Sequence, residues 1–303
     1  MSTVIDLFAG LGGFSEAAEQ CGLKVIWAGN HWRAAVETHR VNHPGAVVEC
    51  QDLAQADFTQ IEQCDWLVGG PSCIGHTRSR GKERPHHDAA RSTAWAMITC
   101  AEVHRPEVVI VENVPEFTRW VLFPGFLQCL TSLGYAVEFH ELDAADFGVP
   151  QNRVRLFIVA TRSLFPIGLK FEKQPHKPIE PHIEWYDGRW TEIEKQGRAQ
   201  TTLARIQRGR EELGDRFLLP YYGATRTGRS VHRPIGTLTT HDRYAIVNGK
   251  HMRMLSVTES KAAMGFRADY KVPNRRKDAI HMLGNAVPPP LAAAVIREIQ
   301  RRL

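Results

Sequence analysis

Val4-Ile5-Asp6-Leu7-Phe8-Ala9-Gly10-Leu11-Gly12-Gly13-Phe14-Ser15 is the stretch of this 303-residue chain that decides its fold. Residues 4–8 predict a short apolar strand, and residues 15–21 predict an amphipathic helix. The glycines between them let a ligand approach the backbone, and the N-terminus of the helix favours an anionic group. The spacing is not G-x-G-x-x-G, and no Walker lysine follows. An adenosine cofactor that carries a carboxylate therefore fits this turn better than one that carries phosphates.

Outward from this turn, strand-like segments alternate with helical ones. The pattern predicts further strands over 24–28, 66–68, 108–111 and 156–160, and helices over 33–41, 89–104 and 290–303. Such alternation is typical of an α/β fold with a doubly wound, mostly parallel sheet. The length and the 43% hydrophobic content allow a large domain over 1–162 plus 279–303 and a smaller domain over 163–278.

Two reactive side chains follow predicted strands. Gly69-Gly70-Pro71 turns the chain after one strand and leaves Cys73 on a loop, and the strand over 108–111 delivers Glu112. Both would lie at the carboxyl edge of the sheet, where open α/β sheets bind ligands. A lone cysteine is more often a small buried hydrophobe, and a lone glutamate is more often a helix cap or a solvated carboxylate. A third element strengthens the functional interpretation.

That third element is Gln151-Asn152-Arg153-Val154-Arg155, which leads into the last predicted strand of the large domain. Arg153 and Arg155 alternate, so on extended backbone they point to the same face. Two guanidinium groups placed in this way can hold a carbonyl oxygen or a phosphate.

Five segments, in this order, resemble the DNA (cytosine-5) methyltransferase family. They are the glycine turn over 6–14, Pro71-Ser72-Cys73, Glu112-Asn113-Val114, Gln151 to Arg155, and Leu283-Gly284-Asn285-Ala286-Val287-Pro288-Pro289-Pro290-Leu291. The resemblance spans nearly the whole chain. It implies a Rossmann-like fold that uses S-adenosyl-L-methionine, with a target-recognition domain over 163–278.

The resemblance also implies a mechanism. Carbon 5 of cytosine is a poor nucleophile, so the thiolate of Cys73 must first add to carbon 6. Glu112, protonated in a dry pocket, would donate to ring nitrogen 3, while Arg153 and Arg155 orient the ring through its carbonyl oxygen. A thiolate needs a lowered pKa, which basic residues of the following loop would help to supply. A base inside a stacked duplex is out of reach, so base flipping is implied.

By the same resemblance, twelve residues are expected to hold the cofactor: Phe8, Gly10, Leu11, Gly12, His31, Trp32, Asp52, Leu53, Pro71, Asn285, Ala286 and Val287. Three positions depart from the family pattern. His31 stands where the family carries a glutamate, and Ser72 and Ile74 stand where it carries proline and glutamine beside the nucleophile. These departures favour a tolerated variant and leave open a pocket that accepts an unusual base or transfers an altered group.

Charge points to a nucleic-acid partner. Residues 1–150 carry 10 Lys and Arg against 19 Asp and Glu, whereas residues 151–303 carry 28 against 14. A basic C-terminal half is typical of a polyanion-binding surface, although such residues often only solvate a surface or position phosphates. The polar stretch over 76–88 is expected to form a lid. The residues expected at DNA are Arg78, Arg80, Lys82, Arg84, Gln151, Arg226, Arg229, Arg233 and Arg243.

The sequence suggests further partners and surroundings. The six cysteines show no C-x-x-C pair, which indicates a reducing cytoplasm and no structural metal. No membrane span or signal peptide is expected. Double-stranded DNA is the expected partner of a monomer, with a cognate restriction endonuclease as a further option. Alternatives are an RNA cytosine methyltransferase and an inert DNA-binding homologue, although the latter needs neither Cys73 nor Glu112.

Overall fold

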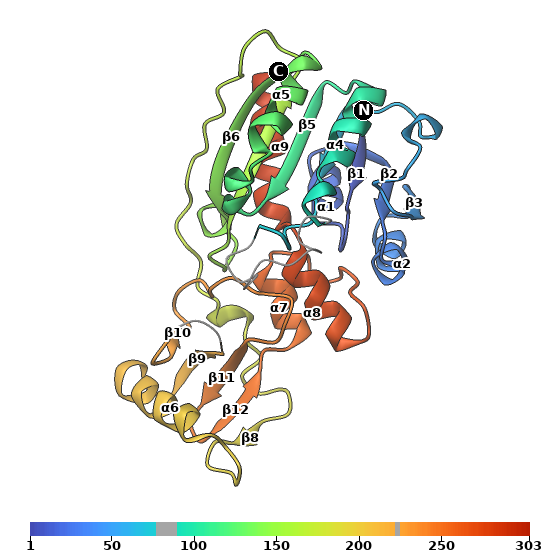
Figure 1. Ribbon diagram of the computed structural model, residues 1–303. Helices are drawn as coiled ribbons and strands as arrows, with labels where there is room; N and C mark the ends of the chain where they lie inside the picture. Colours follow the sequence, from blue (N-terminus) through green and yellow to red (C-terminus); the bar gives the residue numbers. More distant parts are fainter. Residues whose placement is uncertain (77–89, 222–224) are drawn as a thin grey trace.

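A seven-stranded sheet forms the body of the molecule (Figure 1). The computed structural model describes residues 1–76, 90–221 and 225–303. The strand order is β3-β2-β1-β4-β5-β7-β6, and only β7 runs antiparallel to its neighbours. The bounds are β1 (Thr3–Leu7), β2 (Lys24–Asn30), β3 (Val47–Cys50), β4 (Trp66–Gly69), β5 (Val108–Asn113), β6 (Ala136–Asp143) and β7 (Val154–Thr161). The predicted doubly wound, mostly parallel sheet is confirmed.

Helices cover both faces of this sheet, because its central strands are apolar on both sides. In β5, Val109 and Val111 belong to one buried cluster, and Val108 and Ile110 belong to the other. Helices α4 (Trp95–His104) and α5 (Phe123–Ser132) contribute to the first cluster, and α1 (Gly13–Gln20) and α9 (Pro289–Arg302) to the second. Helix α2 (Arg33–Asn42) packs against β2 and β3. The C-terminal helix therefore returns to the N-terminal part of the chain.

The sequence did not predict β3 and β6, which are the two edge strands. In β3 only Val48 is buried, and in β6 no residue is fully buried. Neither strand has the apolar run that marks the buried strands. Short 3-10 helices connect several elements: η1 (Phe58–Gln60), η3 (Pro115–Arg119), η4 (Ala144–Phe147) and η5 (Glu180–His182).

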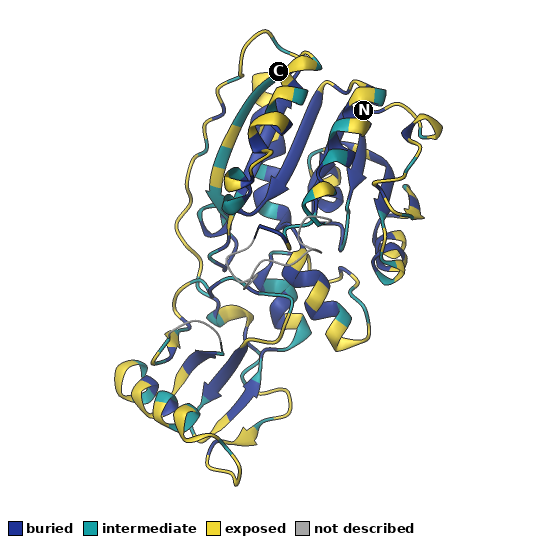
Figure 2. Cartoon of the chain, viewed as in Figure 1, coloured by how far each residue is buried: buried dark blue, intermediate teal, exposed yellow. Residues whose placement is uncertain are grey.

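A second, antiparallel sheet lies below the first in Figure 1. Its order is β10-β9-β11-β12-β8, with β8 (Thr191–Glu192), β9 (Arg216–Pro220), β10 (Arg229–Ser230), β11 (Tyr244–Asn248) and β12 (His251–Met254). Helix α6 (Gln200–Leu213) packs Ile206 on this sheet and leaves its outer face exposed (Figure 2). A Cβ at Gly209 would lie 2.5 Å from the ring of Phe217, which explains a glycine inside the helix.

Helices α7 (Val257–Ala263) and α8 (Arg276–Asn285) lie between the two sheets (Figure 1). A single buried cluster contains Leu11 from the glycine turn, Leu218 from the small sheet and Leu283 from α8. The two sheets therefore share a core, and α8 crosses the predicted boundary at 278/279. That boundary stays a prediction.

Residues 276–302 contain α8 and α9, and by length and apolar composition this stretch passes for a membrane span, contrary to expectation. However, 78% of its most apolar window is buried inside the protein, which is what a core helix shows.

Candidate active site

A cavity of about 500 Å³ lies at the carboxyl ends of β1, β2, β4 and β5. This is the edge at which the sequence predicted the reactive side chains to meet. The cavity is lined by all four predicted catalytic residues and by nine of the twelve predicted cofactor residues: Cys73, Glu112, Arg153, Arg155, Phe8, Gly10, Leu11, His31, Trp32, Pro71, Asn285, Ala286 and Val287. Asp52, Leu53 and Gly12 are not part of this lining.

The glycine turn has an unusual backbone. Phe8, Gly10 and Gly12 all adopt left-handed φ angles, of 59°, 53° and 93°. A Cβ at Gly13 would lie 2.0 Å from the carbonyl oxygen of Val287, so the turn and the C-terminal segment touch through bare backbone. A Cβ at Gly12 would lie 2.5 Å from the hydroxyl of Tyr270. The absence of a side chain at Gly12 thus leaves room for the Tyr270 hydroxyl beside the turn.

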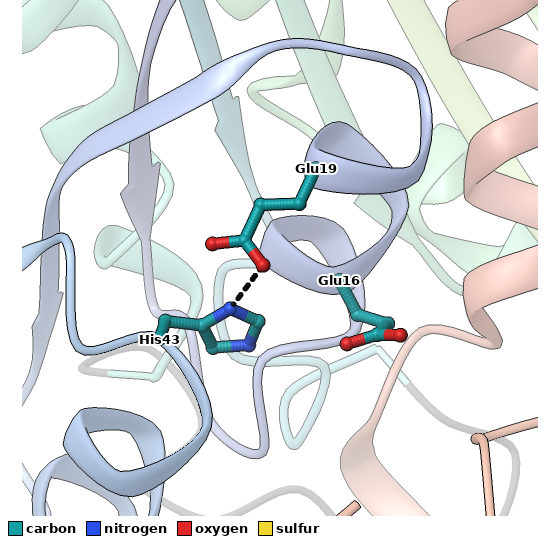
Figure 3. Close-up of side chains that lie close together, drawn as sticks. All are labelled: Glu16, Glu19 and His43. Atoms are coloured by element: carbon teal, nitrogen blue, oxygen red, sulfur yellow. Dashed lines mark ion pairs between the residues drawn. The ribbon is translucent and has the colours of Figure 1, made fainter.

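A series of connected polar side chains, Tyr270, His43 and Glu19, supports the glycine turn. The Tyr270 hydroxyl donates to the carbonyl of Leu11 at 2.6 Å, and Nε2 of His43 lies 2.9 Å from that hydroxyl. On its other side, Nδ1 of His43 lies 2.9 Å from the carboxylate of Glu19 (Figure 3). This series therefore links the half-exposed carboxylate of Glu19 to the glycine turn.

Glu16, Glu19 and His43 bring one ligand atom each within 4.8 Å of one another, a spacing that suits a metal ion (Figure 3). Glu16 is already engaged, because it accepts from Arg267 at 3.1 Å and from Gln20 at 2.8 Å. We therefore interpret this cluster as ionic support for the turn.

Cys73 lies on the loop after β4 and is half-buried. Burial raises the pKa of its thiol, and Arg155 only partly opposes this effect. Among the described residues the balance of these effects is a raised pKa, opposite in direction to the expected lowering. The basic residues predicted to lower the pKa, Arg78, Arg80, Lys82 and Arg84, lie outside the described residues, as does nearly all of the expected lid.

The backbone of Ser72 explains one departure from the family pattern. Its N–H donates to Oγ1 of Thr93 at 3.1 Å, and that hydroxyl donates to the carbonyl of Ala90 at 2.7 Å. Proline has no N–H and cannot make the first bond. The hydrogen bond to Thr93 thus restrains the nucleophile loop where the family uses a fixed φ angle. Ile74 is exposed, and nothing in the structure explains its place.

Glu112 and Arg155 form an ion pair inside the cavity. Nε of Arg155 lies 3.0 Å from Oε1 of Glu112, and both side chains are largely buried. Burial raises the pKa of Glu112, while Arg155 and then Arg153 pull it back. The pair is placed to face a flat, polar ring.

Arg153 and Gln151 do not have the roles expected of them. The guanidinium of Arg153 is 1% exposed and donates to the carbonyls of Leu238, Gly284 and Ala286. Its pKa falls to about 9, chiefly through burial. Gln151 is fully buried. Its Nε2 donates to the carbonyl of Ala263 and its Oε1 accepts from the N–H of Leu238, so its side chain is not presented to DNA. Arg155 alone has the geometry expected of both arginines.

Among the cavity residues that the sequence interpretation missed are Asn30 and Asp6. Asn30 is the last residue of β2, and its Oδ1 accepts from the N–H of Trp32 at 2.9 Å. Asp6 is 1% exposed; one carboxylate oxygen accepts from Ser15 at 2.7 Å, and the other has no hydrogen-bond partner among the described residues. Burial raises the pKa of Asp6 to about 7. A strand-end position at the ligand edge was the signal available for Asn30.

The predicted DNA-contacting arginines of the second half lie away from the cavity lining. Arg226, Arg229, Arg233 and Arg243 are all exposed. They belong to β10 and to the loops around the small sheet. Their exposure is compatible with the predicted contact and does not show it.

Comparison with known proteins agrees with this site. A family model described as C-5 cytosine-specific DNA methylase matches residues 2–301. The chain belongs to the C-5 cytosine-specific DNA methylase family. The family suspected from the five segments is thereby confirmed, and with it the enzyme class.

Several curated members of this methylase family are similar along the chain. Type II methyltransferase M.MspI of Moraxella sp is 26% identical over 99% of this chain and 70% of that protein. M.MthTI of Methanothermobacter thermautotrophicus is 25% identical over 99% and 97%. M.AgeI of Thalassovita gelatinovora is 32% identical, over 51% of this chain and only 38% of that protein.

Solved structures confirm the methylase fold. A DNA modification methyltransferase encoded within an E. coli prophage superposes with a TM-score of 0.72 at 17% identity, over 99% of both chains. A mutant DNMT2 of Spodoptera frugiperda gives 0.71 at 15% identity, over 99% of this chain and 100% of that one. At these identities the likeness concerns the fold alone.

Proposed function

We propose that this protein transfers a methyl group from S-adenosyl-L-methionine to carbon 5 of a cytosine flipped out of a specific duplex DNA site. The observation that carries the proposal is a single cavity that holds a thiol, a buried carboxyl paired with a guanidinium, and a glycine turn. The relatives named type II methyltransferases support a place in a restriction-modification system. We further propose that the protein acts in the cytoplasm as a monomer, beside a cognate endonuclease.

The described residues fit the cofactor. Asp6 lines the cavity, and a carboxylate there suits the ammonium group of the methionine moiety. Asn30 and His31, at the end of β2, line the cavity and would hydrogen-bond the ribose hydroxyls, and Trp32 would pack its ring on the adenine. S-adenosyl-L-methionine supplies a methyl group bonded to a cationic sulfur.

The chain's own side chains then carry the reaction. Sγ of Cys73 loses its proton to water and bonds to carbon 6, and the displaced electron pair moves to ring nitrogen 3, which takes a proton from the Glu112 carboxyl. Arg155 holds Glu112 in position and faces the ring oxygen. Carbon 5, now nucleophilic, would take the methyl group that bound S-adenosyl-L-methionine supplies, with S-adenosylhomocysteine as the leaving group. Loss of the carbon 5 proton to solvent expels Sγ, and Glu112 recovers its proton.

Purified protein with labelled S-adenosyl-L-methionine tests the proposal, with plasmid DNA and bulk transfer RNA as competing substrates. Nucleoside mass spectrometry should find 5-methylcytosine in the DNA with the native chain and none with Cys73→Ala. A duplex that contains 5-fluorocytosine should trap a covalent adduct through Cys73. Labelled RNA in place of DNA would indicate the RNA alternative, and no label with no adduct would leave an inert binder.

A further inference from the structure

The side chain of Arg153 joins two segments that the chain order keeps far apart. Its Nη1 donates to the carbonyl of Leu238 at 3.0 Å, and its Nη2 donates to the carbonyls of Gly284 and Ala286 at 2.8 and 3.0 Å. Its Nε has no hydrogen-bond partner among the described residues, and the side chain is 1% exposed. A buried cation held by carbonyl oxygens is costly to leave unpaired, so each of these three bonds constrains the others.

The first of these segments leads into the small sheet. Leu238 is held at both backbone groups, because its N–H also donates to Oε1 of Gln151 at 2.8 Å. The neighbouring Thr237 donates its hydroxyl to the carbonyl of Asn152 at 2.9 Å. Five residues after Leu238 the chain reaches the exposed Arg243, just before β11. We name residues 237–243 the recognition segment.

The second segment forms one wall of the cavity. Gly284 and Ala286 flank Asn285, and all three line the cavity. The two segments also touch directly, since a Cβ on Gly284 would lie 2.4 Å from the carbonyl group of Thr239. A shift of the wall would therefore press on the recognition segment as well as pull on Arg153.

Arg153 is also linked to the reacting groups. It precedes β7, and Arg155, two residues further on, pairs with Glu112. The backbone N–H of Arg153 is fixed by Asp143 at 2.7 Å, so the base of the side chain has little freedom to move.

We propose that Arg153 is a positioning residue that couples occupancy of the cofactor cavity to the position of the recognition segment, and through it to DNA. The coupling rests on the proposed function for the identity of its two ligands. When a cofactor fills the cavity against residues 284–287, the carbonyls of Gly284 and Ala286 become fixed. Arg153 and the Gly284 contact then hold Leu238 and Thr239 in a single arrangement, and the recognition segment meets DNA already ordered.

Amide hydrogen exchange with and without S-adenosylhomocysteine tests this coupling. In the native chain, saturating S-adenosylhomocysteine should slow exchange in a peptide over 235–244 by about tenfold, within the usual range for coupled sites. A peptide over 193–203, which contains the start of α6, should not respond. The readout is the change caused by S-adenosylhomocysteine, so a general loss of stability does not imitate it.

Three variants locate the coupling. Arg153→Met keeps the length and removes every donor, and it should bind S-adenosylhomocysteine, judged by slowed exchange over 8–14, without slowing 235–244. Arg153→Lys, the milder change if the methionine variant does not fold, should keep part of the response. Thr237→Val is the matched control, because it removes a bond of the same segment and leaves Arg153 intact, so its response should be native.

The outcomes separate this inference from the function. If the native chain shows no slowing over 8–14, the proposed cofactor site and the coupling both fail. If it shows slowing over 8–14 and none over 235–244, the coupling alone fails. A native-like response in both Arg153 variants would equally overturn the role of this side chain.

Discussion

The two sheets of this molecule differ in how firmly the side chains expected to act there are held by their neighbours. At the carboxyl edge of the seven-stranded sheet, the expected reacting groups are held by partly buried neighbours, as Arg155 holds Glu112 and Thr93 holds the loop of Cys73. Around the five-stranded sheet, the arginines expected at DNA are exposed. Chemistry needs atoms held to fractions of an ångström, whereas a recognition surface needs shape and charge. The first requirement leaves short motifs in the sequence, and the second does not.

The largest effect should come from the catalytic edge. Glu112→Gln removes the proton donor and should lower the single-turnover rate by about 10²–10⁴-fold with DNA affinity unchanged. Because burial raises the pKa of Glu112, the native rate should rise with pH as Cys73 ionises and fall at higher pH as Glu112 loses its proton. The variant should lack the fall at high pH. A rate profile over pH checks this, and an unchanged alkaline limb would remove Glu112 from the role of acid.

A second change at the catalytic edge concerns stability. The pKa of Asp6 lies at about 7 in the folded chain against 3.8 as its ordinary value, so the folded state binds the proton more tightly. The free energy of unfolding should therefore fall by a few kcal/mol as pH rises from about 4 to about 7, since one pKa unit corresponds to about 1.4 kcal/mol. Asp6→Asn should remove this dependence and weaken cofactor binding. Urea unfolding of both chains at pH 5 and pH 8 measures this pH dependence. An equal change in the free energy of unfolding between the two pH values in both chains would contradict the prediction.

The recognition side should respond in affinity and not in rate. Arg233→Ala and Arg243→Ala should each weaken DNA binding by about tenfold and lower the salt slope by about one, with the rate at saturating DNA unchanged. Arg162→Ala is the matched control, because Arg162 is exposed beyond the far end of β7. Binding titrations at several salt concentrations decide the point. A loss of rate with intact affinity would erase the contrast between the two sheets.

The smallest effect should come from the nucleophile loop. Thr93→Val should cost about 1 kcal/mol more in the native chain than in a Ser72→Pro background, because proline has no N–H to leave unpaired. The bond from Thr93 to Ala90 is lost in both backgrounds and cancels. Unfolding of the four chains gives the coupling energy. A value near zero would mean that Thr93 does not restrain this loop.

Local pattern predicted the central strands, because β4 and β5 are apolar on both faces. It did not predict β3 and β6, whose edge positions need few buried side chains. It placed Cys73 and Glu112 together, since parallel strands end at one edge.

The same pattern could not separate Arg153 from Arg155. Alternation gives a face of the backbone, whereas the partners of Arg153 come from 85 to 133 residues further along the chain. Asn30 was passed over because the resemblance pointed to its neighbour His31, which stands where the family carries a glutamate. In the structure β2 continues to Asn30 and brings it to the cavity.

The contact between Gly13 and Val287 also orders events in time. The carbonyl of Val287 lies where a side chain on Gly13 would be, and α9 packs on α1. During synthesis Gly13 is made more than 270 residues before Val287, the residue whose carbonyl it contacts. A nascent chain therefore holds no finished cavity at the glycine turn until residues 284–287 have been made. The five-stranded sheet is made in between, so the cavity can close only after the strands of both sheets exist.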